Sequence, residues 1–121
     1  MPSFTAVPPS NRKNLIWRLN EPDILGSPIW QFEGETVTYT VTVEGTSAPS
    51  SPSATVYKNG TDVTSTVMPS GSHTASGQVI TMKPVTALVA GSDYSIMLQA
   101  TVGGSTELRR MVVQCPLHKS T

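Results

Sequence analysis

The residue types that usually carry catalysis or metal binding are few in this chain and far apart. His73 and His118 lie in separate predicted loops, and neither belongs to a cluster of ligands that could form a metal site. Glu33 and Glu35 flank a glycine and could form a carboxylate pair, although such a pattern before a strand is more often a charged turn. No G-x-S-x-G, Walker or Rossmann motif occurs. We therefore predict no catalytic, cofactor-binding or metal-binding residue, and no cofactor.

The overall composition limits the classes of partner. Eight basic and eight acidic residues give a formal net charge of zero, so we expect no direct binding to nucleic acid or to a membrane surface. The single cysteine, Cys115, excludes an intrachain disulfide, and its place in a strand pattern predicts a buried, unreactive thiol. The N-terminal prolines do not match a signal peptide, and no window is long and apolar enough to span a membrane.

The segment 88–115 predicts a long β-hairpin that forms the centre of the core. Apolar residues alternate with polar ones over 94–102, with Met97 as the one apolar residue on the polar side. Gly103 and Gly104 supply the positive φ angles of a tight turn, and the chain then returns with the same alternation. This pattern is typical of two half-buried strands.

The remaining sequence reads as short strands between loops. The segment 35–44 has the clearest alternation, and Asn59-Gly60 is a strong turn signal, so both residues are assigned a structural role. Further strands are expected over 12–19, 53–57, 62–67 and 78–82, with loops over 45–52 and 69–77. About seven antiparallel strands predict an all-β, immunoglobulin-like β-sandwich, with a closed barrel as the alternative. We expect an extended arm over 1–11, the sandwich over 12–115 and a tail over 116–121. The arm is expected to dock on a neighbour, with a disordered tail as the alternative.

The segment Leu88-Val89-Ala90-Gly91-Ser92-Asp93-Tyr94 resembles the approach to strand F in fibronectin type III domains. In that family a leucine, a glycine and a tyrosine form a tyrosine corner, in which the phenol bonds back to the backbone. The resemblance implies structural roles for Leu88, Gly91 and Tyr94.

A second resemblance covers residues 35–115. The segments VYKNGTDVTSTV and ELRRMVV, in this strand order, look like those of small immunoglobulin-like proteins encoded among the structural genes of tailed bacteriophages. Such proteins are described as head-tail or fibre-tail adaptors or as capsid decoration proteins. The resemblance implies a non-enzymatic virion protein, made in the host cytoplasm, that assembles in several copies on capsid, portal, tail or fibre proteins.

Five residues are candidates for an interface with such partners. Phe4 and Val7 are the apolar anchors of the expected arm. Core packing is the default for Trp17 and Trp30, but Trp30 lies beside a loop, and tryptophan is favoured at interfaces. Arg109 and Arg110 should point to opposite faces of their strand, where they either protect a sheet edge or contact a carboxylate of a neighbouring subunit. The alternative function is a fibronectin type III-like adhesion or carbohydrate-binding module of a cell-surface protein, and an enzyme is the third possibility.

Overall fold

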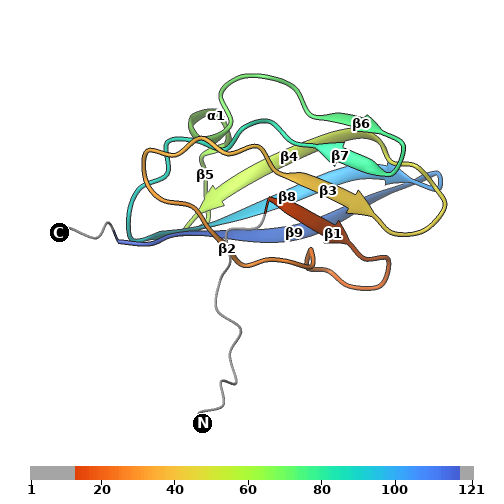
Figure 1. Cartoon of the computed structure of the whole chain (residues 1–121), viewed down its shortest axis with the longest axis horizontal. Coiled ribbons are helices and arrows are strands. Elements are labelled where there is room, and N and C mark those ends of the chain that lie inside the picture. Colours follow the sequence, from red (N-terminus) through yellow and green to blue (C-terminus); the bar gives the residue numbers. More distant parts are fainter. Residues whose placement is uncertain (1–12, 118–121) are drawn as a thin grey trace, which may run out of the picture.

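The computed structural model describes residues 13–117, which form two β-sheets (Figure 1). The four-stranded sheet has the order β1 (Asn14–Trp17), β3 (Thr40–Val43), β7 (Val79–Thr81) and β6 (Thr74–Ser76). The five-stranded sheet has the order β2 (Ile29–Trp30), β9 (Ser105–Cys115), β8 (Ser92–Val102), β4 (Ser50–Lys58) and β5 (Thr61–Asp62). The one helix of the described residues, α1 (Thr64–Val67), has four residues, and no helix there is long and apolar enough to cross a membrane. The all-β prediction is confirmed.

The expected set of about seven antiparallel strands is wrong, because the described residues form nine strands and both sheets are mixed. β1 pairs in parallel with β3, and β2 pairs in parallel with β9, whereas the other strand pairs are antiparallel. The parallel pairs arise because the chain leaves the first sheet after β1, adds β2 to the second sheet and returns to form β3. Parallel neighbours need such long crossovers, which local alternation does not reveal.

The hairpin of β8 and β9 is confirmed and runs along the length of the molecule (Figure 1). Its register is continuous from the pair Ser92 and Cys115 to the pair Val102 and Ser105. Gly103 and Gly104 form the two-residue turn with φ angles of 60° and 84°. The apolar side of this hairpin faces inward, as its alternation predicts.

One hydrophobic core joins the two sheets. Leu15 and Trp17 of β1 and Ile80 of β7 are fully buried in the same cluster as Ile96 of β8 and Met111 of β9. The strands form two separate sheets, not the single closed sheet of a barrel. The molecule therefore has two layers with their apolar faces packed against each other.

Four predicted segments differ from the structure. The strand expected over 62–67 is mostly α1, because the Asp62 carboxylate accepts hydrogen bonds from the backbone N–H of Thr64 at 2.9 Å and from its hydroxyl at 2.6 Å. These bonds turn the chain out of the strand direction after two residues of β5. The strand expected over 35–44 is limited to β3, although Val37 still pairs with Val85 as an isolated bridge.

The other two differences are strands where loops were expected. β4 begins at Ser50, inside the loop predicted over 45–52, and β6 lies inside the loop predicted over 69–77. Both segments are rich in serine, and all three residues of β6 are exposed. The start of β4 is a strand because it pairs with β8, and β6 is a strand because it pairs with β7. The residues of these two segments alone therefore do not predict strands.

A buried glutamine holds the two sheets together at one end. The Gln31 side chain is fully buried, and its Nε2 donates hydrogen bonds to the carbonyl oxygens of Glu35 at 3.0 Å and Val85 at 2.8 Å. Its Oε1 accepts a bond of 2.8 Å from the Tyr39 hydroxyl, and its backbone N–H donates to Gln114 of β9 at 3.0 Å. Burial, with a smaller effect of the Glu35 charge, raises the pKa of the Tyr39 phenol well above its ordinary value. Gln31 therefore links β9 to the segments that lead into and out of the other sheet.

One loop segment and one proline protect parts of the sheet edges. The segment 22–25 pairs with both sheets: it makes two backbone hydrogen bonds of 2.8 Å with Arg110 of β9 and two of 2.7 and 3.1 Å with Ile16 of β1. On the other side of the five-stranded sheet, Pro52 lies in β4 and has no N–H to offer. Addition of a foreign strand at these positions is therefore obstructed.

Removing the buried amide should destabilise the protein. We expect Gln31→Leu to lower the free energy of unfolding by about 2–4 kcal/mol, because the Tyr39 hydroxyl and two carbonyl groups lose their partner. Urea unfolding measures this change, and Gln99→Leu on the exposed side of β8 is the matched control. Tyr39→Phe combined with Gln31→Leu should cost less than the sum of the two single changes. Equal effects of Gln31→Leu and Gln99→Leu would contradict this role.

Stability should fall in mild acid through His73. Its Nδ1 accepts the backbone N–H of Lys83 at 3.2 Å, and burial together with the Lys83 charge lowers the pKa of His73. Because the unfolded chain then binds the proton more readily, stability is complete above about pH 6.5 and is lost as pH falls through the lower pKa of the folded state. Unfolding in urea across this pH window measures the loss. In a His118→Gln background, His73→Asn should remove most of the pH dependence, and an unchanged pH profile would count against the assignment.

Candidate functional site

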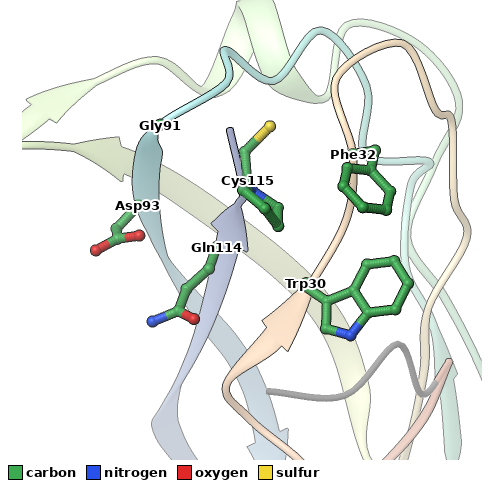
Figure 2. Close-up of a pocket in the computed structure, with 7 residues that line it drawn as sticks. Trp30, Phe32, Gly91, Asp93, Gln114 and Cys115 are labelled. Carbon is green, nitrogen blue, oxygen red and sulfur yellow. The ribbon is translucent and has the colours of Figure 1, made fainter. Parts of the chain in front are cut away.

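An open groove of about 530 Å³ lies at one end of the five-stranded sheet (Figure 2). We name it the aromatic groove, and its lining residues are Trp30, Phe32, Gly91, Asp93, Gln114, Cys115 and Pro116. They come from β2 and the residues after it, from the start of β8, and from the end of β9. The groove therefore depends on the parallel pairing of β2 with β9.

The sheet register sets which side chains face the groove. Ile29 is buried beside Val113, so the next residue, Trp30, points to the opposite side of the sheet. Trp30 pairs with Gln114, which in turn pairs with Asp93, and these three side chains form one row across the sheet. In Figure 2 the Asp93 carboxylate and the Gln114 amide point away from the two aromatic rings, toward the rim. The groove thus has an aromatic wall and a polar rim.

The aromatic wall is held in place by a turn. The Trp30 and Phe32 rings are both half-buried, with centroids 5.0 Å apart and an angle of 60° between their planes. The Phe32 backbone N–H donates to the Glu35 carboxylate at 2.9 Å, and the Glu35 N–H donates back to the Phe32 carbonyl at 3.1 Å. Glu35 therefore closes a turn with Phe32, and this turn fixes the segment that carries the two rings.

The thiol at the base of the groove is poorly suited to act as a nucleophile. Cys115 is 2% exposed, and burial raises its pKa, with a further rise from the negative charge of Glu33. The Glu33 backbone hydrogen bond to the sulfur opposes part of this rise, and the Glu35 charge adds to it. Because a thiolate is the reactive form, this thiol stays protonated and packs as a small apolar group. The same charges show that carboxylates lie close to the groove.

Apolar side chains continue beyond the groove over the outer face, the side of β9, β8 and β4 that points away from the core. Val112 and Met97 on this face are half-buried, while Tyr57 is 36% and Leu108 is 48% exposed. Met97, the apolar exception in the predicted alternation of β8, belongs to this set. Ser95, Gln99 and Arg110 lie among them in the same rows, so the outer face is a mixed apolar and polar surface.

Arg109 and Arg110 lie on opposite sides of β9, as predicted. β2 pairs only with Val113 and Gln114, and the edge of β9 beside Arg110 is covered by the segment 22–25. The Arg109 side chain is only 11% exposed, and its guanidinium carbon lies 5.0 Å from the centroid of the Trp17 ring. It donates hydrogen bonds to the carbonyl oxygens of Arg18 at 2.9 Å and Leu19 at 2.7 Å. Arg109 therefore covers the end of the core.

Arg110 lies on the outer face and pairs with a carboxylate of its own chain. Its Nε is 2.8 Å from the Asp23 carboxylate, and both side chains are about half exposed. Asp23 raises the pKa of Arg110 through this hydrogen bond and its charge. A contact of either arginine with a neighbouring subunit stays a prediction.

The residues assigned to the tyrosine corner come together at the end of β9. The Val89 backbone N–H donates to the Tyr94 hydroxyl at 2.8 Å, and Leu88 is 2% exposed. Gly91 has a φ of 82° and donates its N–H to the Cys115 carbonyl at 2.8 Å, while a Cβ at this position would lie 3.1 Å from Leu117. This corner therefore fixes one end of the aromatic groove.

The other predicted residues lie elsewhere. Asn59 and Gly60 form the turn between β4 and β5, with φ angles of 51° and 82°. Phe4 and Val7 lie outside the described residues. Among residues 13–117, no group of three or more histidine, cysteine, aspartate or glutamate side chains is arranged to hold a metal ion.

Sequence reasoning selected Trp30 as an interface residue, Gly91 as a structural one and Cys115 as a buried thiol, but gave no role to the other groove residues, Phe32, Asp93, Gln114 and Pro116. The alternation of Trp30, Gln31 and Phe32 was an available signal, because it places the two rings on one side of the chain. Asp93 and Gln114 reach the groove through sheet pairing, which local sequence does not report.

Comparisons with protein-family models, with curated proteins and with solved structures found no match. The proposals below accordingly depend on the geometry of the groove and outer face and on the resemblances carried by the sequence.

The contact between Arg109 and Trp17 should be specific for arginine. We expect Arg109→Lys to lower the free energy of unfolding by about 1–3 kcal/mol, because lysine lacks the planar fork that reaches both carbonyl groups. Urea unfolding monitored by circular dichroism measures the change. Arg18→Lys is the matched control, since the Arg18 side chain is 42% exposed and its ion pair with Glu44 is 3.8 Å long. Equal stability of the two variants would rule out the specific contact.

Proposed function

We propose that the protein is a non-enzymatic structural protein that binds other proteins through the aromatic groove and the outer face. The observation that carries this proposal is the row of Trp30, Gln114 and Asp93, which opens a groove with an aromatic wall and a polar rim beside further apolar side chains. Tryptophan, tyrosine and methionine are enriched at the centres of protein interfaces. The groove and outer face have this composition.

The finer fold assignment in this proposal is an immunoglobulin-like sandwich. Two features support it: two sheets share one core, and the Val89 N–H bonds to the Tyr94 hydroxyl as in a tyrosine corner. Together with the resemblance of residues 35–115, this fold supports a virion protein of a tailed bacteriophage. Its role would be capsid decoration or cementing, or that of a head-tail or fibre-tail adaptor.

Binding in this proposal uses the face of a sheet. The chain has a formal net charge of zero, so long-range attraction contributes little to affinity. The sheet edges beside Arg110 and Ile16 are occupied by the segment 22–25, which disfavours addition of a partner's strand there. Affinity would come from burial of the aromatic rings and the outer face, with Asp93 and Gln114 fixing the orientation of the partner.

One observation also favours the alternative of a carbohydrate-binding adhesion module. The Trp30 and Phe32 rings are partly exposed, and Asp93 and Gln114 line the same groove with their polar groups toward its rim. Aromatic faces stack on the apolar faces of sugars, while carboxylate and amide groups bond their hydroxyls. A glycan ligand would therefore use the same groove.

Particle binding distinguishes the two functions. We expect purified particles of the virus that encodes this chain to contain many copies of it, measured by quantitative mass spectrometry. Particles stripped of the chain should rebind it, and Trp30→Ala should weaken rebinding at least about tenfold, because a central aromatic anchor is lost. Leu19→Ala is the matched control, since Leu19 is 47% exposed and lies outside the groove.

The opposite result supports the alternative. Absence of the chain from particles, together with binding on a glycan array that Trp30→Ala abolishes, would replace the virion proposal with the carbohydrate-binding one. Circular dichroism and urea unfolding should show that both variants stay folded.

A further inference from the structure

We propose that the aromatic groove of one copy binds the N-terminal segment, residues 1–12, of a neighbouring copy. This inference rests on the proposed assembly function and names the occupant of the groove. Residues 1–12, MPSFTAVPPSNR, lie outside the described part of the chain, so their chemistry is taken from the sequence. Three properties of this segment match the groove: its prolines, its charge and its length.

The prolines suit an aromatic slot. Pro8 and Pro9 favour an extended polyproline conformation in which the backbone carbonyl groups stay free of internal hydrogen bonds. Such segments bind grooves lined by aromatic rings, against which the proline rings pack. The Trp30 and Phe32 rings contact each other, with centroids 5.0 Å apart and an angle of 60° between their planes, and together form one such wall. The Gln114 amide on the rim can donate to the free carbonyl groups.

The charges of segment and groove are complementary. Residues 1–13 contain no aspartate or glutamate and end with Arg12 and Lys13. The groove is lined by Asp93, and the charges of Glu33 and Glu35 act on the Cys115 thiol at its base. A basic segment thus meets an acidic site, although the whole chain is neutral.

The direction of the segment favours a neighbouring copy, and its length permits one. Twelve residues can span about 40 Å when extended, which is about three times the radius of gyration of about 13 Å of a domain of this size. The segment is joined to the sandwich at Lys13, whose carbonyl accepts the N–H of Thr40 on the four-stranded sheet. The groove opens on the outer side of the other sheet. A contact from one layer of a copy to the opposite layer of the next is head-to-tail, and it can repeat to form rings or rows.

A complementation experiment tests this contact in full-length chains. One variant, Trp30→Ala, keeps the segment and damages the groove, and the other, Pro8→Ala with Pro9→Ala, keeps the groove and damages the segment. Sedimentation velocity should show concentration-dependent association of the original chain, weakened at least tenfold in each variant alone. An equimolar mixture of the two variants should form a 1:1 dimer, because one intact segment and one intact groove remain. Ser10→Ala and Leu19→Ala are the controls for segment and groove.

Photocrosslinking identifies the contact itself. A benzoylphenylalanine at Val7 should crosslink to peptides that contain Trp30 or Gln114, and mixing with isotope-labelled chain should place the crosslink between two copies. Asp93→Asn should weaken association and reduce its dependence on salt. A monomer at all concentrations, failure of the mixture to associate, or crosslinks confined within one copy would each overturn the inference. If Trp30→Ala abolishes particle binding and the proline changes have no effect, the inference about the N-terminal segment is overturned and the proposed function is kept. If copies associate through the groove but the chain does not bind particles, the inference is kept and the proposed function is overturned.

Discussion

The Gln31 amide, buried between the sheets, is the interaction on which the functional face depends. An uncharged polar group in a core is costly unless its donors and acceptors are paired, and here the side chain reaches two carbonyl groups and the Tyr39 hydroxyl. Those partners come from the segments around β3 and β7, while the Gln31 backbone bonds to β9. An apolar side chain at this position would keep the backbone bond to Gln114 but could not join the two carbonyl groups and the hydroxyl.

The orientation of Gln31 also determines that of its neighbours. Because alternate residues of an extended chain point in opposite directions, an inward amide at position 31 turns Trp30 and Phe32 outward. Two large aromatic residues that would by default enter the core are thereby left half exposed. The aromatic groove is in this sense a consequence of satisfying one buried polar side chain.

Sequence reasoning predicted what depends on local periodicity. The hairpin of β8 and β9 and the Asn59-Gly60 turn follow from alternation and from residues that accept positive φ. The parallel pairs, β1 with β3 and β2 with β9, depend on long-range contacts. The helical turn after Asp62 depends on one specific pair of hydrogen bonds to its carboxylate. The burial of Gln31 was not expected because glutamine is ordinarily exposed. Trp30 was selected for its size and position beside a loop, but the groove around it needed the order of strands in the sheet.

The segment 22–25 has a mechanical consequence. Its backbone bonds to Ile16 in one layer and to Arg110 in the other, so the segment links the two layers in series, and a force that slides the layers past each other must break at least one of the two pairs of bonds. The two bonds of each pair carry this load together. In a subunit joined to its neighbours through opposite layers, the segment 22–25 would carry part of the force between the two sheets and help to keep them packed together.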